Sequence, residues 1–240
     1  MIDSTNLVPL YYQIKEELLR EIQSGKWTVG GMIPSEIQLS QKYNVSRNTA
    51  QRAINELVHE GVLSRKQGVG TFVVSPKIEQ ALTGFYSFSQ TMRNQGIEAS
   101  AKVLSLTKEI ANKVQAKYLN IMPGDELFVL KRIRYANSVP IMLDESRIPV
   151  ALAPNIDAFD FEKNSLYDVL DRAYNIHVVR AKEIFEPVII QRQESFCLEV
   201  EENSPAIMLE RVAFSSQDVP VEFCRSVIPG DKCRFYTELR

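Results

Sequence analysis

Apolar positions near the start of the chain recur every three or four residues, the spacing of a helix with one buried face. This stripe consists of Leu10, Ile14, Leu18 and Ile22. Pro9 precedes it, at a position where a missing backbone N–H costs nothing, and Gly25 follows it. The pattern predicts a first helix that ends near Gly25. Trp27, in the loop beyond, is expected to anchor that loop in the core.

Two shorter helices are predicted after this loop, joined by a tight turn. Ser35 and Ser46 each stand before an apolar stripe, where helix-capping side chains are preferred. Asn44 lies between the stripes and tolerates the left-handed backbone of a turn. The stripes consist of Leu39 and Tyr43, and of Ala50, Ala53, Ile54 and Leu57. This arrangement is typical of a helix-turn-helix.

Residues 62–74 alternate between apolar and polar positions and carry glycines at their centre, which predicts a β-hairpin. Gly68 and Gly70 belong to the turn, where glycine lets a backbone approach another molecule closely. Arg65 and Lys66 lie near the tip, where their charges can meet phosphates. A hairpin at this place after a helix-turn-helix predicts a wing.

The side of the third helix opposite its apolar stripe is polar in its first turns. Its residues are Arg47, Asn48, Thr49, Gln51 and Arg52. Recognition helices present their first turns to base edges in the major groove, where Arg pairs with guanine and Asn or Gln with adenine. A solvated polar face is the alternative, but the flanking turn and hairpin favour contact with DNA.

The pattern breaks at residues 75–77 (SPK), which indicates a domain boundary. Helices are then expected at residues 109–119, 166–174 and 191–200, and strands at residues 127–136, 140–148, 177–187, 206–215 and 220–228. These elements predict an antiparallel sheet with helices packed on it, so the fold class is α+β. The expected domains are a winged helix-turn-helix at residues 1–75, a linker at 76–82 and a second domain at 83–240.

Two segments of the second domain resemble each other: ELFVLKRIRYANSVPIMLDESRIP and AIMLERVAFSSQDVPVEFCRSVIP. Each predicts a strand, a turn, Val-Pro, a second strand and Ile-Pro. Pro140 and Pro220 are 80 positions apart, and Pro149 and Pro229 keep the same offset. The repeat indicates a duplicated helix–hairpin unit with a ligand pocket between its halves. A chance similarity of two hairpins is the alternative.

Arg132 and Arg134 are two residues apart and therefore point to one face of their predicted strand. Two arginines on one face suit a bound anion such as a phosphate. The alternative is a solvated outer face, or ion pairs with Asp144 or Glu145.

Other polar residues of the second domain are candidates for the same ligand. Residues 85–90 (FYSFSQ) supply hydroxyls and rings, and Ser165 and Tyr167 stand at a predicted helix start, which attracts anions. Glu222 shares a strand face with Cys224 and can accept hydrogen bonds from sugar hydroxyls.

The composition narrows the classes of protein that fit. The length of 240 residues allows two domains, and no apolar run approaches the roughly 18–20 residues of a membrane helix. The first residues lack a basic region, so no signal peptide is expected and the location is cytoplasmic.

The three cysteines are expected to be reduced thiols. Neither a metal nor a cofactor is expected, since the two histidines lie far apart.

The charge distribution also bears on function. The net charge is −2, whereas a pure nucleic-acid binder is usually basic. Residues 47–66 are locally basic, which fits a DNA-binding head attached to a larger domain of another function.

Residues 9–74 resemble the DNA-binding head of the GntR family of bacterial transcription regulators. The resemblance rests on the segments PLYYQIKEEL, IPSE, YNVSRNTAQRAINEL and EGVLSRKQGVGTFV. It implies a transcription regulator, acting as a repressor, that binds a palindromic operator in double-stranded DNA as a homodimer. Ile37 and Gln51 stand where the family commonly carries basic residues. The predicted DNA contacts are Ser35, Glu36, Ser46, Arg47, Asn48, Thr49, Gln51, Arg52, Arg65, Lys66, Gln67, Gly68 and Gly70.

Residues 76–240 resemble the UTRA effector-binding domain of the HutC-type branch of that family, whose fold is related to chorismate lyase. The motifs lie at residues 85–89 (FYSFS), 132–134 (RIR), 165–167 (SLY), 180–182 (RAK) and 222–226 (EFCRS). The chain looks most like regulators of amino-sugar use that sense N-acetylglucosamine-6-phosphate or glucosamine-6-phosphate. Ile228 stands where those regulators have a tyrosine.

The resemblance implies a role for each matching position. Asp144 and Glu222 would bind sugar hydroxyls, and the phosphate would be held by Ser89, Arg132, Arg134, Ser165 and Tyr167. The full set of predicted effector-binding residues is Ser87, Phe88, Ser89, Arg132, Arg134, Asp144, Ser165, Tyr167, Arg180 and Glu222.

Three alternatives differ in their effector or their chemistry. The same architecture could sense another phosphorylated sugar, such as trehalose-6-phosphate, or a non-sugar metabolite. The relation to chorismate lyase allows a lyase-type enzyme, although the sequence contains no evident nucleophile–base pair. An architectural DNA binder without an effector is the third.

Overall fold

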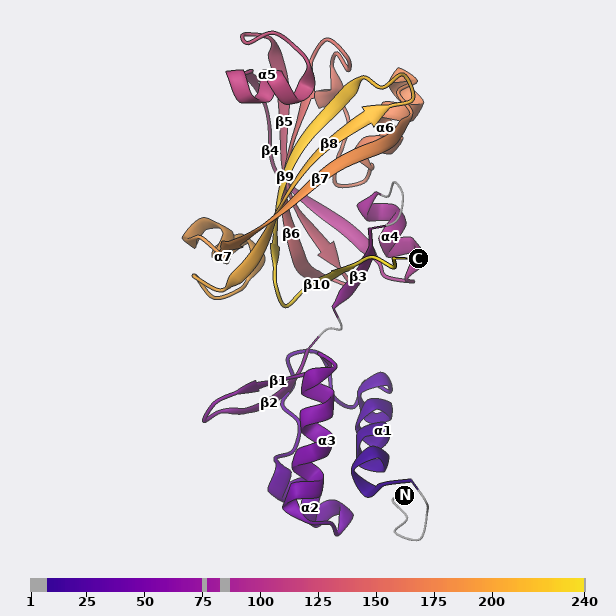
Figure 1. Cartoon of the computed structure of the whole chain (residues 1–240), viewed down its shortest axis with the longest axis vertical. Helices are drawn as coiled ribbons and strands as arrows, with labels where there is room; N and C mark the ends of the chain where they lie inside the picture. The colour runs from indigo at the N-terminus through magenta and orange to yellow at the C-terminus, as the bar shows by residue number, and fades with distance from the viewer. Residues whose placement is uncertain (1–7, 75–76, 83–86, 240) are drawn as a thin grey trace. The chain divides into compact units, whose positions relative to one another are not determined.

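The structure is a computed structural model that describes residues 8–74, 77–82 and 87–239 (Figure 1). The chain divides into two compact units, residues 1–77 and 78–240. The predicted boundary at Ser75 and Pro76 lies outside the described residues. Phe85 and Tyr86, which begin the predicted aromatic segment, lie outside them as well.

The first unit contains the predicted helices and hairpin. Its elements are α1 (Leu10–Gln23), α2 (Glu36–Tyr43), α3 (Arg47–His59), β1 (Leu63–Lys66) and β2 (Gly70–Val73). The buried core joins the apolar stripes of all three helices to Leu63 and Val73 of the hairpin. The helix-turn-helix and its hairpin are therefore confirmed, and one shared core positions α3 and the wing.

Local capping explains the sharp turn between α2 and α3. The Ser35 hydroxyl accepts a hydrogen bond from the Gln38 backbone N–H at 3.4 Å, while the Gln38 side chain accepts one from the Ser35 N–H. Asn44 ends α2 with a φ of 50°, and Ser46 caps α3 by accepting from the Thr49 N–H at 3.1 Å. Both predicted caps and the predicted turn residue are confirmed.

Glu21 ties the loop after α1 to α2. Its carboxylate accepts hydrogen bonds from Lys26 at 2.5 Å, Lys42 at 2.8 Å and the Trp27 indole at 2.9 Å. Burial opposes ionisation of this carboxyl, but these hydrogen bonds outweigh it and lower the pKa of Glu21 to about 2. Trp27 packs against the core as predicted.

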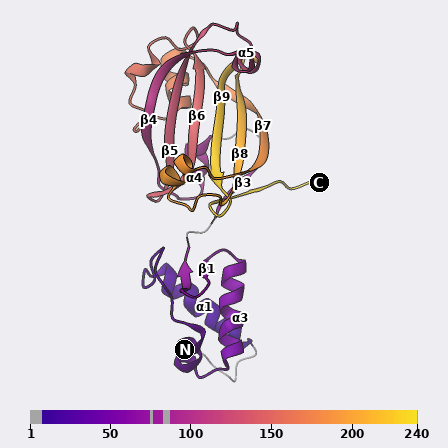
Figure 2. The same cartoon turned by 90° about the vertical axis from the view of Figure 1, so that its left-hand side faces the viewer.

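The second unit is built on a six-stranded antiparallel sheet of order β4-β5-β6-β9-β8-β7 (Figure 2). Its strands are β4 (Ala99–Ile110), β5 (Glu126–Ala136), β6 (Val139–Pro149), β7 (Val178–Ile189), β8 (Pro205–Ser215) and β9 (Pro220–Pro229). Counted inward from either edge, three strands follow each other in chain order: β4, β5 and β6 from one edge, and β7, β8 and β9 from the other. Glu145 of β6 pairs with Arg225 of β9, 80 positions later, which agrees with the repeat in the sequence.

Helices cover both faces of this sheet (Figure 1). The outer face carries α5 (Lys113–Leu119) and α7 (Arg192–Leu198), which pack near opposite ends. The inner face carries α4 (Phe88–Asn94) and α6 (Leu166–Tyr174). A short 3-10 turn, Ile156–Ala158, also joins the core on the inner face.

A small parallel pair of strands closes one end of the inner face. It consists of β3 (Ile78–Ala81) and β10 (Cys233–Tyr236), in the register Cys233 to Ile78. Most of the described part of the segment expected as a linker, residues 76–82, is thus a strand of the second unit. The last strand of the chain holds the segment through which the chain enters this unit.

The structure corrects one expected element and adds others. The helix expected at residues 109–119 begins only at Lys113, because Glu109 and Ile110 still belong to β4. The sequence did not predict α4, β3, β4 or β10. Among the described helices, none combines the length and apolar character needed to cross a membrane.

Candidate functional site

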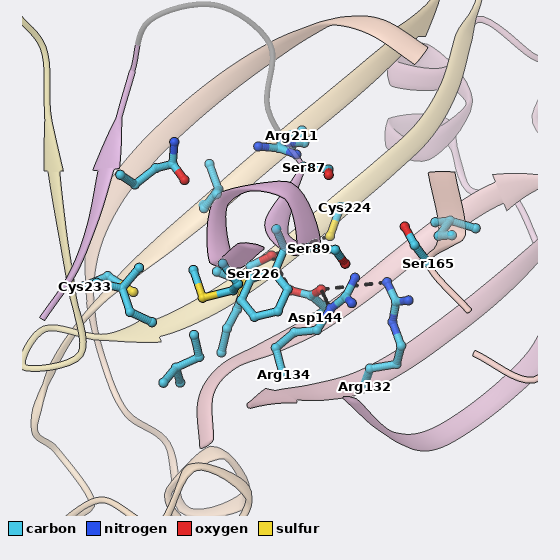
Figure 3. A pocket seen from close by; sticks show the side chains of 18 of the residues that line it. Ser87, Ser89, Arg132, Arg134, Asp144, Ser165, Arg211, Cys224, Ser226 and Cys233 are labelled. Carbon is cyan, nitrogen blue, oxygen red and sulfur yellow. Dashed lines mark hydrogen bonds and ion pairs between the residues drawn. The ribbon is translucent and has the colours of Figure 1, made fainter. Parts of the chain in front are cut away.

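A pocket opens on the inner face of the second unit, between the sheet, α4, α6 and the β3–β10 pair (Figure 3). It encloses about 780 Å³ of space not filled by atoms, with open solvent at its mouth included. Nine of the ten predicted effector-binding residues line it: Ser87, Phe88, Ser89, Arg132, Arg134, Asp144, Ser165, Tyr167 and Glu222. Residues from β5, β6, β9 and two helix starts thus converge on one cavity.

Arg132 is the most unusual side chain in the pocket. It is 1% exposed, and its Nε and Nη1 atoms have no hydrogen-bond partner among the residues that the structure describes. Its Nη2 atom lies 3.8 Å from Asp144 Oδ2. Burial, and then the neighbouring Arg134, lower the pKa of Arg132 to about 10, so the guanidinium still carries its charge at neutral pH. Two N–H donors therefore remain for a ligand.

Asp144 is the carboxylate next to both arginines. Its Oδ2 accepts a hydrogen bond from Arg134 Nε at 2.7 Å, and its Oδ1 accepts one from the Ser226 hydroxyl at 2.8 Å. Burial would raise the pKa of Asp144, but Arg134, Arg132 and Ser226 together lower it. The carboxylate stays ionised at neutral pH and fixes the Arg134 guanidinium, which lies 5.1 Å from the Phe88 ring centroid.

The arginine pair has features of both interpretations of its sequence pattern, the anion site and the ion pairs. The two guanidinium groups form ion pairs with Asp144, while Glu145 faces the other side and contacts Lys131 and Arg147. Neither arginine lies on a solvated outer face, since both line the pocket. The ion pair leaves Arg132 with unused donors, so it does not exclude an anionic ligand.

A second polar group lies on the β8–β9 side of the pocket. The Tyr167 hydroxyl donates a hydrogen bond to Glu222 Oε2 at 2.6 Å, and Arg211 pairs with Glu183 at 2.5 Å. Burial and the nearby Glu222 carboxylate raise the pKa of Tyr167 well above its usual value. The phenol stays protonated, so it is a hydrogen-bond donor.

The sequence reasoning missed Arg211 and Ser226. Arg211 pairs in register with Cys224, and Ser226 pairs with Asp144 across β6 and β9. Counting the register of the second hairpin from its turn would have placed Arg211 opposite the strand that contains Glu222. For Ser226, the missing information was the register between the two hairpins.

The hydroxyls at the helix starts differ in how they are used. The Ser87 hydroxyl accepts a hydrogen bond from the Gln90 N–H at 3.3 Å and so caps α4. Ser165 stands at the N-cap of α6, but its side chain makes no capping hydrogen bond. Ser165 lies on the same side of the pocket as Arg132 (Figure 3).

The pocket is suited to binding rather than covalent catalysis. Burial raises the pKa of the Cys224 thiol to about 12, so it is not a thiolate nucleophile at neutral pH. No group of three or more His, Cys, Asp or Glu side chains suited to a metal ion occurs within the described ranges. The arrangement provides buried hydrogen-bond donors, carboxylates and hydroxyls around a small cavity.

Arg180 does not belong to this pocket, which corrects its prediction as an effector contact. Its guanidinium stacks over the Phe214 ring at 3.8 Å and pairs with Asp218. A register irregularity lies between Val178 and Arg180 in the pairing of β7 with β8. Arg180 is exposed near the end of an edge strand, away from the cavity lining.

In the first unit, some of the predicted DNA contacts are exposed, while others are held by hydrogen bonds within the head. Arg47, Asn48 and Gln51 are exposed on the first turns of α3. The Thr49 hydroxyl is hydrogen-bonded to Ser46 at 2.8 Å, and Ser35 caps α2. At the start of α3, the exposed polar groups that could contact DNA are thus those of Arg47, Asn48 and Gln51.

The remaining predicted contacts are partly held by neighbours within the head. Arg52 stacks over Tyr11 at 3.8 Å, and Lys66 lies 5.6 Å from the Phe72 ring centroid. Arg65 donates to Glu36 at 2.9 Å and so links the wing to α2. These contacts fix the positions of the basic groups. Gln67 and Gly68 lie exposed at the tip.

Gly70 closes the turn of the wing, where it pairs with Lys66 and adopts a backbone conformation that favours glycine. Its φ is 155°, and a Cβ atom there would lie 2.7 Å from the Met32 sulfur. Gly68 has a φ of 74°, in the left-handed region that favours glycine. The wing turn therefore depends on both glycines.

Comparison with known proteins supports both units. The model of the "Bacterial regulatory proteins, gntR family" matches residues 10–73, and that of the "UTRA domain" matches residues 94–234. The HTH-type transcriptional repressor NagR of Bacillus subtilis is 31% identical over 234 residues, covering 98% of this chain and 96% of its own. A probable fructoselysine utilization operon transcriptional repressor of Escherichia coli K12 is 34% identical over 221 residues, covering 90% of each chain.

Solved structures agree with the fold. The crystal structure of PhnF from Mycobacterium smegmatis matches with a TM-score of 0.72 and 26% identity, covering 95% of this chain and 99% of that one. The α+β prediction, with a winged helix-turn-helix and an antiparallel sheet carrying helices, is confirmed. The matching families are regulators rather than enzymes.

Proposed function

The chain belongs to the GntR family of bacterial regulatory proteins, and we propose that it is a homodimeric repressor whose operator binding is controlled by a phosphorylated sugar. The first unit would bind the operator through α3 and the wing. The second would bind the effector in the inner pocket. Binding of the effector would then shift the protein toward or away from the conformation that binds DNA.

The buried Arg132 is the observation that carries the effector assignment. A guanidinium with two unpartnered N–H donors is costly to bury, and an anionic group would satisfy both donors. Arg134, Ser89 and Ser165 line the same cavity, so three oxygens of a phosphate would have several donors. Asp144 and Glu222 would accept hydrogen bonds from the hydroxyls of the attached sugar.

The names of the relatives point to more than one class of metabolite. One is named for fructoselysine utilization, whereas others are named as histidine utilization repressors. A non-sugar effector is therefore the second candidate. The hydroxyl-binding carboxylates beside the arginine pair favour the sugar.

The proposal is tested by a screen of sugar phosphates on the full-length protein. A phosphorylated sugar that binds the native state should raise the melting temperature, because binding adds RT ln(1 + [L]/Kd) to the stability. The same compound should change the affinity for the operator in a fluorescence-anisotropy titration. A compound that binds tightly but leaves operator affinity unchanged would contradict the regulatory role.

The outer face of the second unit is the surface we assign to the homodimer. Phe196 on α7 is 88% exposed, and Met122 after α5 is 73% exposed. Arg147 of β6, which lies beside the start of α5, has buried Nε and Nη1 atoms without a hydrogen-bond partner among the described residues. Exposed apolar side chains near both ends of the face suit a second copy of the chain.

Replacing Phe196 with aspartate should weaken this dimer by at least about tenfold in Kd, since a charge would replace a large ring that the second copy would bury. Sedimentation velocity at several concentrations measures the change. Phe159→Asp is the matched control, because Phe159 is 37% exposed beside the inner-face helix α6. Equal dissociation constants for Phe196→Asp and the parent chain would move the interface elsewhere.

A further inference from the structure

The inner pocket has two chemically different ends. The arginine pair, Ser165 and the carboxylates define the polar end described above. The rest of the lining includes six apolar side chains: Ile78, Met92, Ile141, Met142, Leu209 and Phe235. Two of them border the polar end, because Met142 pairs in register with Arg134 and Leu209 with Ser226. Figure 3 shows Cys233, the register partner of Ile78, on the side of the cavity opposite Arg132 and Ser165.

These six residues, here termed the apolar end, come from four places in the second unit. They lie on β3, α4, the sheet and β10, and four of them belong to one buried cluster. Phe235 is held by Phe185, whose ring centroid lies 4.9 Å away. The apolar end is thus a built wall of the cavity rather than a loose surface patch.

Gln80 is a polar side chain at this end, but its amide is already used. Its Nε2 donates to the Ala81 carbonyl at 2.7 Å, and its Oε1 accepts from the Thr91 hydroxyl at 2.9 Å. The boundary between the two ends is marked by Phe88, whose ring faces the Arg134 guanidinium. A ligand that reaches past Phe88 therefore enters apolar surroundings.

We propose that the effector carries an apolar substituent, an alkyl or aryl group, that occupies the apolar end while its anionic group lies at Arg132 and Arg134. This inference rests on the proposed function and adds the chemical class of the ligand's far end. A sugar hydroxyl placed there would lose its water among side chains that are mostly apolar in the described part of the chain, which is unfavourable. A hydrocarbon group there would gain from leaving water.

The specificity of the pocket then comes from both ends together. Unsubstituted hexose phosphates would satisfy the polar end but leave the apolar end filled with water. Phosphorylated compounds with an apolar arm would displace that water and bind more tightly. The protein would therefore distinguish substituted from unsubstituted phosphorylated metabolites.

An alkyl phosphate series tests this directly. Methyl, butyl and hexyl phosphate would be titrated into the full-length protein by calorimetry. Each buried CH₂ group is expected to tighten binding by about fourfold, so hexyl phosphate, with two more such groups, should bind roughly fifteenfold more tightly than butyl phosphate. Hexanol, which lacks the anionic group, should bind far more weakly than hexyl phosphate.

Variants assign the gain to the apolar end. Leu209→Asn should reduce the advantage of hexyl over butyl phosphate to less than about threefold. Val212→Asn is the matched control, since both residues are buried on β8 but Val212 faces the outer side. Met142→Gln, at a half-buried position of similar size, should have the same effect as Leu209→Asn and decides the matter if Leu209→Asn does not fold.

The outcomes separate this inference from the proposed function. Equal affinity for methyl and hexyl phosphate, with binding that depends on Arg132, would overturn the apolar substituent alone. A chain-length gain that persists in Leu209→Asn and Met142→Gln would also overturn it. Absence of binding by all three phosphates would overturn the anion assignment, and this inference with it.

Discussion

Arg132→Met should abolish the response of operator binding to the effector. The variant removes both unused N–H donors and the buried charge at the polar end of the pocket. Losing hydrogen bonds from a charged donor in a desolvated site typically costs 2–5 kcal/mol, so effector affinity should fall by about two orders of magnitude or more. Calorimetric titration of the effector measures the loss, and operator anisotropy measures the lost response.

The stability of this variant makes the test sharper. Because Arg132 is buried and two of its nitrogen atoms have no hydrogen-bond partner in the described part of the chain, replacing it with an apolar side chain should leave the melting temperature of the free protein unchanged or raise it. Lys131→Met, on the same strand but paired with Glu145 on the outer side, is the matched control and should keep full effector binding. Unchanged effector affinity in Arg132→Met would assign the buried arginine to structure alone.

Arg47→Ala should have the second largest effect, on operator affinity. Arg47 is exposed in the first turn of α3, where a bidentate contact to a guanine is worth about 1–3 kcal/mol. A dimer would lose this contact in both half-sites, so affinity should fall by about one to four orders of magnitude. Fluorescence anisotropy at fixed ionic strength measures the effect, because salt alone shifts such affinities.

Comparison with unspecific DNA separates reading from simple charge attraction. Arg20→Ala removes the same charge from α1, where Arg20 pairs with Glu17, and should change operator affinity little. Arg47→Ala should reduce affinity for the operator far more than for a scrambled duplex. If it weakens binding to both duplexes equally, Arg47 contacts phosphate rather than a base.

The parts of the fold that follow local periodicity could be predicted from the sequence. The helix stripes, the Ser35 and Ser46 caps and the alternating hairpins all depend on residues close in the chain. The strand β4 was missed because its edge position leaves most of its residues exposed and polar, so its alternation is weak. The β3–β10 pair joins residues about 155 positions apart, which no local pattern indicates.

The residues of the site could be predicted from the sequence, but the distances between them could not. The motif positions identified the arginine pair, Asp144, Tyr167 and Glu222. Their distances depend on how β6 pairs with β9, which is a contact between two hairpins. The apolar end was not found because it forms only where β3, α4 and β10 meet the sheet, whereas Arg211 could have been placed from the register of its own hairpin. Arg180 was predicted in the pocket but does not line it.

The repeated order of the sheet has a consequence for how such a pocket can diversify. Because Glu145 and Arg225 are equivalent positions that pair with each other, the two halves of the sheet meet at an approximate two-fold axis, and the cavity lies close to it. Two separate identical chains would have to line such a cavity with the same residues twice. Within one chain each half can change alone, so one side holds Arg132 and Arg134 and the other holds Glu222. The asymmetry that a single ligand demands is thus available through single substitutions.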